Sequence, residues 1–547
     1  MGRGSTYVSV WILLLLCIKY EVHSSWSMNE EGNIHHRSET HAIGRDEINP
    51  HDSDSQWENH GNGLLNQRRA KCTRITNRTV ADLQLRWAFV TGGDVSATPA
   101  IADGVVYFPA WNGMLYALDE HTGALLWSTD LLQLAGGVAS NGSRATPTVW
   151  KDLLLIGMMG PASVAAINRH DGTVRWMSRL LDTTAFSVIT MSGTAYDGFF
   201  YVGTSSLEET NTCCAFQGSF SKINITDGSV VWRTRMLPPD SGYFGAAIWG
   251  SSPSIDPGKR LVFIATGNNY RVPESVEACE AERSRNSSIS KDTCLDAGNH
   301  MDSMLALNID DGSIVWSRNL LAYDAWTSVC QASPTTPNCP DVLGPDYDFG
   351  EAPMIIYLDD AHPSHSRRNG KLCIVVAGQK SGFVWALDCD TGSIVWSTAA
   401  GPGSALGGAI WGSCSDGKRV YTNIGNVFHS DFILAPSNEV TNASGWVAMD
   451  AATGKVLWSK GEPTGGYSLG PLSVSNGVVF VTSLTEGGDI YALDALTGAV
   501  LWHNTTGAGI YGGVSISRSC IFVGNGYHKL FQYEGIGVRA FCLPDDG

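Results

Sequence analysis

One short motif recurs along the chain, and this recurrence constrains the fold more than any other feature. The copy YALDEHTGALLW runs from Tyr116 to Trp127 and contains Asp119 and a turn at Thr122-Gly123. In every copy an Asp or Asn stands four residues before the Gly, and the Gly stands four residues before the Trp. The seven copies end at Trp127, Trp176, Trp232, Trp316, Trp396, Trp458 and Trp502, and LQLRW, ending at Trp87, is a truncated eighth. Such regularity indicates an array of similar units.

The spacing of these tryptophans predicts an all-β, eight-bladed β-propeller. The basic interval is about 40 to 50 residues, which is the length of a four-stranded blade. Short apolar runs separated by turn residues fill each interval and are typical of antiparallel strands. Closing the ring requires the N-terminal segment to pair with the C-terminal one, because the first motif is incomplete and the chain continues past Trp502 to Phe541. The insertions Arg271–His300 and Ala322–Arg368 should form loops on one face.

The residues of the motif need only a structural explanation. The Asp or Asn side chain can bond nearby backbone in the turn between the last two strands, and Gly allows positive φ. The Trp is large enough to pack between neighbouring sheets and can satisfy its indole N–H there. We therefore expect function to depend on residues that break the repeat.

Charge and the N-terminal sequence restrict partners and location. The net charge of −17 leaves no basic field to attract phosphates, so we expect no nucleic-acid partner. Residues 1–25 resemble a secretory signal peptide, with Val10–Ile18 as an apolar core too short to span a bilayer. An uncleaved anchor is the alternative. We expect a secreted protein with no membrane span in its mature form, a mobile polar leader at 26–55 and a propeller at 56–547.

Cysteines and sequons agree with an extracellular protein. Twelve of the thirteen cysteines remain if Cys17 leaves with the signal, and an even count suggests disulfides. The pairs Cys279/Cys294 and Cys330/Cys339 are close enough in sequence to close local loops. Glycosylation sequons begin at Asn77, Asn141, Asn224, Asn286, Asn442 and Asn504.

The repeated motif resembles the tryptophan-docking motif of quinoprotein alcohol dehydrogenases. These eight-bladed propellers hold pyrroloquinoline quinone (PQQ) on the axis, and polyvinyl alcohol dehydrogenase-like proteins are the most similar branch. Typical segments of that branch are SSLEE…CCAFQGS (Ser205–Ser219) and YDAWT…GPDYDFG (Tyr323–Gly350). The opening pattern W-x-x-x-G-x-x-x-x-N-x-R is supplied by Trp57, Gly61, Asn66 and Arg68.

The resemblance implies which residues hold the quinone. Arg144 matches an arginine that contacts the quinone carboxylates, and Thr190 a threonine with a similar role. Trp249 matches the floor beneath the planar quinone, and Trp411 and Asn426 repeat its pattern and should line the same pocket. An aromatic platform and cations suit a planar tricarboxylate. The alternative for Trp249 and Trp411 is ordinary core packing.

The resemblance also implies a calcium site and a catalytic pair. Glu208 or Glu209, together with Asn268, would bind calcium, and Asp324 would lie beside the metal as general base. Lys380 would stabilise charge on the reduced quinone oxygen. The adjacent glutamates cannot both point the same way in a strand, so only one should bind. Asn268 could instead be a turn residue, and Asp324 a solvated loop carboxylate.

Three features mark differences within the resemblance. Cys213-Cys214 matches the adjacent-cysteine bridge of these enzymes but stands elsewhere along the chain, and two separate disulfides are the alternative. Gln217 replaces an arginine of the branch, which removes a cation. No C-x-x-C-H is present, so no c-type haem is attached and a separate electron acceptor is needed.

The leading hypothesis is a secreted oxidoreductase that uses PQQ and calcium to oxidise a small-molecule or polymeric alcohol. Two alternatives remain open. One is a non-redox extracellular propeller that binds glycans or polymers. The other is a quinone-free isomerase or cyclase with Asp324 or Lys380 as base.

Overall fold

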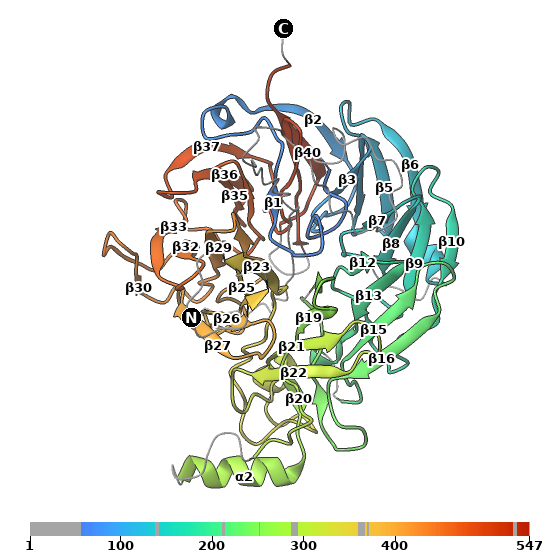
Figure 1. The fold of residues 1–547 in the computed structure, drawn as a ribbon, viewed down its shortest axis with the longest axis vertical. Coiled ribbons are helices and arrows are strands. Elements are labelled where there is room, and N and C mark those ends of the chain that lie inside the picture. Colours follow the sequence, from blue (N-terminus) through green and yellow to red (C-terminus); the bar gives the residue numbers. More distant parts are fainter. Residues whose placement is uncertain are drawn as a thin grey trace, which may run out of the picture.

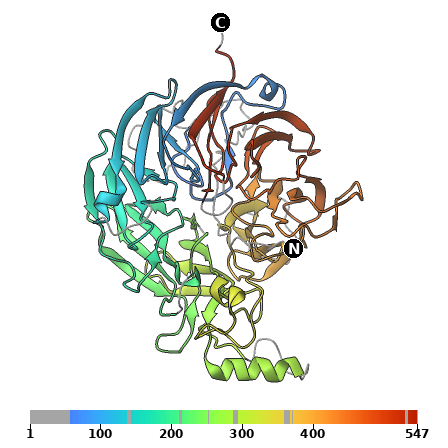
Figure 2. The same cartoon turned by 180° about the vertical axis from the view of Figure 1, so that it is seen from behind.

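Eight sheets, each built on four strands and two of them extended by a short fifth, stand around a central axis in the computed structural model, which confirms the predicted all-β, eight-bladed propeller (Figure 1, Figure 2). The structure describes residues 56–136, 142–210, 214–250, 252–285, 294–358, 367–368, 371–528 and 533–545. The predicted signal peptide (1–25) and leader (26–55) lie outside these residues. None of the helices in the described ranges is both long and apolar enough to cross a membrane.

We number the blades 1 to 8 along the chain. Blade 1 consists of β3 (Ala100–Ala102), β4 (Val105–Pro109), β5 (Met114–Asp119) and β6 (Leu125–Asp130), and blade 2 of β7 (Thr148–Trp150), β8 (Leu153–Gly157), β9 (Val164–Asn168) and β10 (Val174–Met177). Blade 3 consists of β12 (Thr194–Tyr196), β13 (Phe199–Gly203), β15 (Ser219–Asn224) and β16 (Val230–Arg235), and blade 4 of β18 (Ser254–Asp256), β19 (Leu261–Ala265), β21 (Ser303–Asn308) and β22 (Ile314–Asn319). Blade 5 consists of β23 (Met354–Leu358), β25 (Lys371–Gly378), β26 (Phe383–Asp388) and β27 (Ile394–Ala399). Blade 6 consists of β28 (Cys414–Ser415), β29 (Arg419–Ile424), β32 (Gly445–Asp450) and β33 (Val456–Gly461), and blade 7 of β34 (Ser473–Ser475), β35 (Val478–Thr482), β36 (Asp489–Asp494) and β37 (Val500–Thr505). Blade 8 consists of β38 (Ser515–Ser517), β39 (Cys520–Gly524), β40 (Gly537–Cys542) and β2 (Gln84–Val90).

The order of the strands gives the ring two different faces. Neighbouring strands are antiparallel, so the turns after the first and third strands of each blade lie on one face, which we call the turn face. The connections after the second strand and between blades lie on the opposite face, the loop face. First strands such as β7 and β12 lie toward the axis, and fourth strands such as β10 and β16 lie on the outside (Figure 1).

The two ends of the chain close the ring, as the sequence predicts. Strand β2 pairs antiparallel with β40, from Gln84 opposite Cys542 to Val90 opposite Gly537. The indole N–H of Trp502 in blade 7 donates to the Leu83 carbonyl (3.0 Å), which fixes blade 7 to blade 8. The truncated first motif therefore supplies the fourth strand of blade 8.

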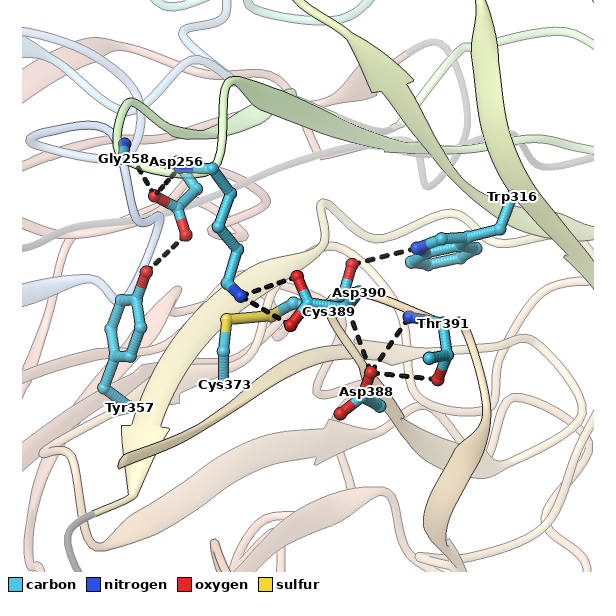
Figure 3. Close-up of polar contacts among 10 residues, drawn as sticks. Asp256, Gly258, Trp316, Tyr357, Cys373, Asp388, Cys389, Asp390 and Thr391 are labelled. Carbon is cyan, nitrogen blue, oxygen red and sulfur yellow. Dashed lines mark hydrogen bonds and ion pairs between the residues drawn. A yellow bond between two sulfur atoms is a disulfide. The ribbon is translucent and has the colours of Figure 1, made fainter. Parts of the chain in front are cut away.

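Each docking tryptophan contacts the next blade along the chain. Figure 3 shows the indole of Trp316 donating to the Cys389 carbonyl of blade 5 (2.9 Å). In the same turn, the Asp388 carboxylate accepts from the Thr391 backbone N–H and hydroxyl. Gly392 has φ +64°, and a Cβ there would lie 2.6 Å from the Trp316 ring. The glycine thus permits both the turn and close packing of the neighbouring tryptophan.

A segment before the first full blade runs along the inner strands of the ring. Residues 57–74, the crossing segment, form backbone hydrogen bonds with blades 1, 2 and 4 to 8, for example from Val149 to Glu58 and from Val474 to Arg68. The fully buried Arg68 donates to the hydroxyls of Ser473 (2.9 Å) and Thr98 (3.2 Å). The W-G-N-R opening pattern therefore has a structural role at the axis.

Each predicted insertion contains a helix. Helix α2 (Glu274–Arg285) projects from blade 4 (Figure 1), and α3 (Ser328–Ala332) belongs to the second insertion. The cysteine pairs predicted from spacing, Cys279–Cys294 and Cys330–Cys339, are disulfides. Two further disulfides join Cys373 to Cys389 and Cys520 to Cys542.

The remaining elements are short. They are α1 (Leu131–Leu134), the 3₁₀ turns η2 (Val80–Asp82) and η3 (Glu208–Thr210), β1 (Arg69–Ala70) beside β34, β24 (Arg367–Arg368) beside β25, and the pairs β11 (Ser187–Val188) with β14 (Ser205–Ser206), β17 (Phe244–Gly245) with β20 (Asn269–Arg271), and β30 (Phe432–Ile433) with β31 (Val440–Thr441).

The Trp–Gly contact can be tested by adding one methyl group. We expect Gly392→Ala to lower the free energy of unfolding by roughly 2–4 kcal/mol, because a Cβ is both strained at positive φ and overpacked. Gly477→Ala is the control, since φ is +83° there but nothing lies within 4 Å of the added Cβ. Denaturant unfolding measures both. Equal losses in the two variants would contradict a role for the contact.

Candidate functional site

Several predicted site residues meet on the loop face around the buried side chain of Lys380. Its ammonium lies 2.7 Å from Asp346 Oδ1 and 3.1 Å from Asp348 Oδ2, and 5.1 Å from the centre of the Trp249 ring. Lys380 is 1% exposed and both aspartates are fully buried. Burial opposes the charge on Lys380, but Asp346 and Asp348 together raise its pKa above the ordinary value. Lys380 is therefore a fixed ammonium above an aromatic ring.

Lys380 is surrounded by an excess of carboxyl groups, which we call the acidic cluster. All of its members are buried and interact electrostatically with Lys380. They are Glu209, Asp302, Asp324, Asp346 and Asp348. Five carboxyl groups face one ammonium, so the cluster cannot be fully ionised at low cost without a further positive charge.

The structure distinguishes the two adjacent glutamates. The Glu208 carboxylate accepts backbone N–H bonds from Ala215 and Phe216 (3.0 Å each), so it holds the following loop. Glu209 joins the acidic cluster, where burial and then the charge of Asp348 raise its pKa to about 8. Both glutamates are buried because they lie in the 3₁₀ turn η3, where the alternation of a strand does not apply.

Asn268 lies beside the acidic cluster. Its backbone N–H donates to Asp348 Oδ1 (2.5 Å), and its side-chain amide donates to the carbonyls of Asn269 (2.9 Å) and Trp326 (2.8 Å). These bonds fix the side-chain orientation. The buried Oδ1 of Asn268 has no hydrogen-bond partner among the described residues.

Asp324 and Asp346 have different surroundings, which the sequence did not distinguish. Both carboxylate oxygens of Asp324 accept backbone bonds, from Asp346 (3.1 Å) and Tyr347 (2.7 Å), and burial raises its pKa to about 7. Asp346 bonds Lys380 through Oδ1, while its buried Oδ2 has no partner in the described part of the chain. Asp324 thus supports the loop that presents Asp346. The GPDYDFG stretch, a typical segment of the branch, was the sequence signal that could have identified Asp346 and Asp348 as site residues.

Trp249 and Trp411 form an aromatic floor next to the cluster. Their ring centres are 5.0 Å apart at 78°, and the Thr190 hydroxyl donates to the Trp249 carbonyl (3.0 Å). Trp411 has φ +71°, and Asp346 (+58°) and Asp302 (+42°) also have positive φ. Such backbone strain in residues other than glycine often accompanies a functional site.

Arg144 lies at the other end of a series of aromatic contacts. It donates to the Tyr527 hydroxyl (2.7 Å), and the Tyr527 ring stacks on Tyr511 at 4.3 Å. Tyr511 in turn contacts Trp411, with ring centres 5.7 Å apart. Arg144 and Lys380 are therefore two cations linked through one aromatic surface. Nothing in the repeat pattern identified the two tyrosines.

Asn426 is engaged in its own loop. Its amide donates to the carbonyls of Ser430 (2.8 Å) and Asn442 (3.1 Å), and its Oδ1 accepts from the Ser430 N–H (3.0 Å). The Asn426 side chain therefore holds this loop together, and its pocket-lining role stays a prediction.

Cys214 is bonded in a disulfide, and Cys213 lies outside the described residues. The Gln217 amide donates to the Tyr243 carbonyl (2.9 Å) and accepts from Arg235 (3.1 Å). Gln217, at the position where the branch has an arginine, is thus hydrogen-bonded to the backbone and to Arg235.

The site residues fit a planar anionic quinone and a hard cation together. Trp249 Nε1, Asn268 Oδ1 and Asp346 Oδ2 are buried polar atoms without partners among the described residues, and amide and carboxylate oxygens suit calcium. No three His, Cys, Asp or Glu side chains in the described ranges are grouped to hold a metal by themselves. Calcium takes about 6–8 oxygens, so oxygens of the quinone would have to complete the ligand set.

Sequence comparison finds relatives among alcohol dehydrogenases. A polyvinylalcohol dehydrogenase from Pseudomonas sp is 27% identical over 391 residues, covering 68% of this chain and 55% of that protein. Another from Sphingopyxis sp. (strain 113P3) is 26% identical over 434 residues, covering 74% and 59%. The chain thus spans a little over half the length of these relatives. A family model described as outer membrane protein assembly factor BamB matches residues 75–237 and 443–535.

Structural comparison supports the same fold. The quinohemoprotein alcohol dehydrogenase from Comamonas testosteroni superposes with a TM-score of 0.67 at 18% identity, covering 90% of this chain and 82% of that one. A europium-containing methanol dehydrogenase gives a TM-score of 0.64 at 17% identity, covering 90% and 99%. The resemblance to the quinoprotein alcohol dehydrogenase-like superfamily, and within it to polyvinyl alcohol dehydrogenases, is confirmed.

The acidic cluster predicts a pH-dependent stability. Because the pKa of Glu209 is raised to about 8, the folded state keeps a proton that the unfolded state loses at lower pH. The free energy of unfolding should therefore fall as pH rises from about 5 to 8. We expect a shallower fall in Glu209→Gln, measured by denaturant unfolding in a chelating buffer.

The exposed Glu282 of α2 supplies the control variant, Glu282→Gln, which should leave the slope unchanged. An unchanged slope in Glu209→Gln would show that Glu209 does not carry this proton.

Proposed function

We propose that this protein oxidises an alcohol with bound PQQ and a calcium-like cation. The observation that carries the proposal is the buried contact of Lys380 with Asp346, Asp348 and the Trp249 ring, beside Glu209. The similarity to polyvinylalcohol dehydrogenases supports it. Bound PQQ would supply a carbonyl group that accepts two electrons from the alcohol.

Trp249 would hold the flat face of the quinone. Its ring packs edge-to-face with Trp411, which restrains the indole plane, and its backbone carbonyl accepts from Thr190, which holds the backbone. Arg144 would bind a quinone carboxylate through a charge-assisted hydrogen bond. Its link to Tyr527 keeps the guanidinium at the rim of the aromatic floor.

Glu209 and Asn268 would hold the cation through oxygen atoms. Asn268 Oδ1 is already oriented by two amide bonds to backbone carbonyls. A cation would also compensate the excess of buried carboxylates and so lower the cost of ionising them. We therefore expect cation and quinone to bind together.

Asp346 would accept the proton of the alcohol hydroxyl. Its Oδ2 is buried without a partner, while Oδ1 is held by Lys380, so one oxygen is positioned and the other is available. Burial raises the pKa of Asp346, and Lys380 opposes this shift, so Lys380 together with the bound cation would favour the ionised carboxylate. Lys380 would also stabilise negative charge that develops nearby. Asp324 is better suited to positioning than to catalysis, because both of its oxygens accept backbone N–H bonds.

Further parts of the proposal concern the surroundings of the reaction. A separate electron acceptor would reoxidise the cofactor, and the alcohol would be a small molecule or a polymer. Residues 1–25 would direct secretion, with disulfides and glycosylation suited to that location.

Cofactor titration tests the proposal. We expect PQQ with calcium to quench tryptophan fluorescence saturably in the purified protein, because Trp249 lies beneath the quinone. Lys380→Met should weaken binding roughly tenfold to hundredfold through loss of one charged contact. Lys222→Met is the matched control, because Lys222 is also buried but bonds the Ile309 carbonyl in another part of the ring. No saturable binding by the unaltered protein would refute the proposal.

Steady-state assays test the assignment of the base. With an artificial electron acceptor and a panel of alcohols, Asp346→Asn should lower kcat by roughly 10²–10⁴-fold, the usual contribution of a general base. Cofactor affinity should change less. A kcat of Asp346→Asn equal to that of the unaltered protein would contradict the assignment and favour Asp324 as the general base.

A further inference from the structure

A second candidate binding site lies on the turn face, between blades 2 and 3. It is a groove of about 920 Å³ lined by Trp150, Lys151, Asp152, Leu153, Arg175, Trp176, Asp197, Gly198, Ile225 and Thr226. These residues come from the turns after the first and third strands, from the adjoining ends of β7 (Trp150) and β8 (Leu153), and from β10. The acidic cluster is built from connections on the loop face, so the two sites lie on opposite faces of the ring.

The groove occupies the place where an ion pair crosses two other junctions between blades. Asp103 in the first turn of blade 1 pairs with Arg169 in the last turn of blade 2. Lys259 in the first turn of blade 4 pairs in the same way with Asp390 of blade 5 (2.6 Å), which is labelled in Figure 3. At the junction of blades 2 and 3, the positions of Arg169 and Asp390 are taken by Ile225 and Thr226. Neither residue can form such an ion pair.

Trp150 is the second unusual feature of this junction. It ends β7 immediately before the two-residue turn, a position taken by Ala102, Tyr196, Ser475 and Ser517 in blades 1, 3, 7 and 8. Trp150 is not the docking tryptophan, because Trp176 donates to the Ile225 carbonyl (2.8 Å) in that role. Both indoles are only partly buried and line the groove. The repeat does not require a second tryptophan here.

The charges along the groove restrict the chemistry of its ligand. Lys151 and Arg175 offset Asp152 and Asp197, so the lining is neutral although the whole chain carries −17. A strongly charged ligand gains no net attraction from such a lining. Hydroxyl groups can accept from the two cations and donate to the two carboxylates. Indole faces add apolar contact with flat, C–H-bearing surfaces.

We propose that this groove binds a neutral oligosaccharide. Sugar rings combine a C–H face that can stack on Trp150 with hydroxyls that can bond Lys151, Asp152, Arg175 and Asp197. The volume suits a ligand of drug size or somewhat larger, which corresponds to a few linked sugar rings. The site is independent of the redox reaction, and it would hold the protein on a glycan-bearing surface while the loop face remains accessible.

Binding to neutral oligosaccharides tests the proposal with the full-length protein. Cello-, xylo- and malto-oligosaccharides are titrated by calorimetry, with linear polyvinyl alcohol as the comparison polymer. We expect saturable binding of at least one oligosaccharide, reduced roughly tenfold or more in Trp150→Ala because a central aromatic contact is lost. Trp150→Tyr should keep most of the affinity, because it retains an aromatic face.

Two control variants separate this site from the redox site. Trp385→Ala removes another partly buried tryptophan, in blade 5, and should leave oligosaccharide affinity unchanged. Lys380→Met disrupts the loop-face site and should also leave it unchanged. Each of four results would overturn the proposal. These are no binding of any oligosaccharide, an affinity of Trp150→Ala equal to that of the unaltered protein, a loss of oligosaccharide affinity in Lys380→Met, and binding of polyvinyl alcohol alone.

Discussion

The contact between a tryptophan of one blade and a glycine of the next holds this structure together. The indole N–H of Trp316 bonds the Cys389 carbonyl, and the ring packs where Gly392 has no side chain. The same arrangement recurs from Trp87, which docks on the turn of Gly123, around to Trp458 and Gly498. Because each blade depends on its neighbour, the ring is stable only when it closes, and β2 with β40 completes it.

Ring closure has a chemical consequence at the axis. Loops that are far apart in sequence meet on one face, so Glu209, Lys380 and Trp249 come together without adjacent positions in the chain. The rigid frame can hold features that would be costly elsewhere, including a buried excess of carboxyl groups and a positive φ at Trp411. Blade packing and the crossing segment provide the stability, and the non-repeating residues provide the chemistry.

The periodic part of the sequence predicted most of the fold, because the motif specifies a turn, a strand and a docking residue together. The choice between Glu208 and Glu209 could not be made from strand alternation, since both lie in a 3₁₀ turn. Asp346 was missed because it belongs to an aperiodic insertion, where no spacing fixes the direction of a side chain. The groove at Trp150 was missed for a related reason: only the comparison of equivalent turns in space shows that this junction has Ile225 and Thr226 where two other junctions have an ion-pairing residue.

A crystal structure of the protein with PQQ and calcium would show directly whether the site holds both. We expect a quinone lying flat on Trp249, with calcium bound by Glu209, Asn268 and quinone oxygens, and Lys380 within hydrogen-bond distance of the quinone. Ordered electron density for Lys380 between Asp346 and Asp348, with no quinone above Trp249 at saturating cofactor, would contradict it.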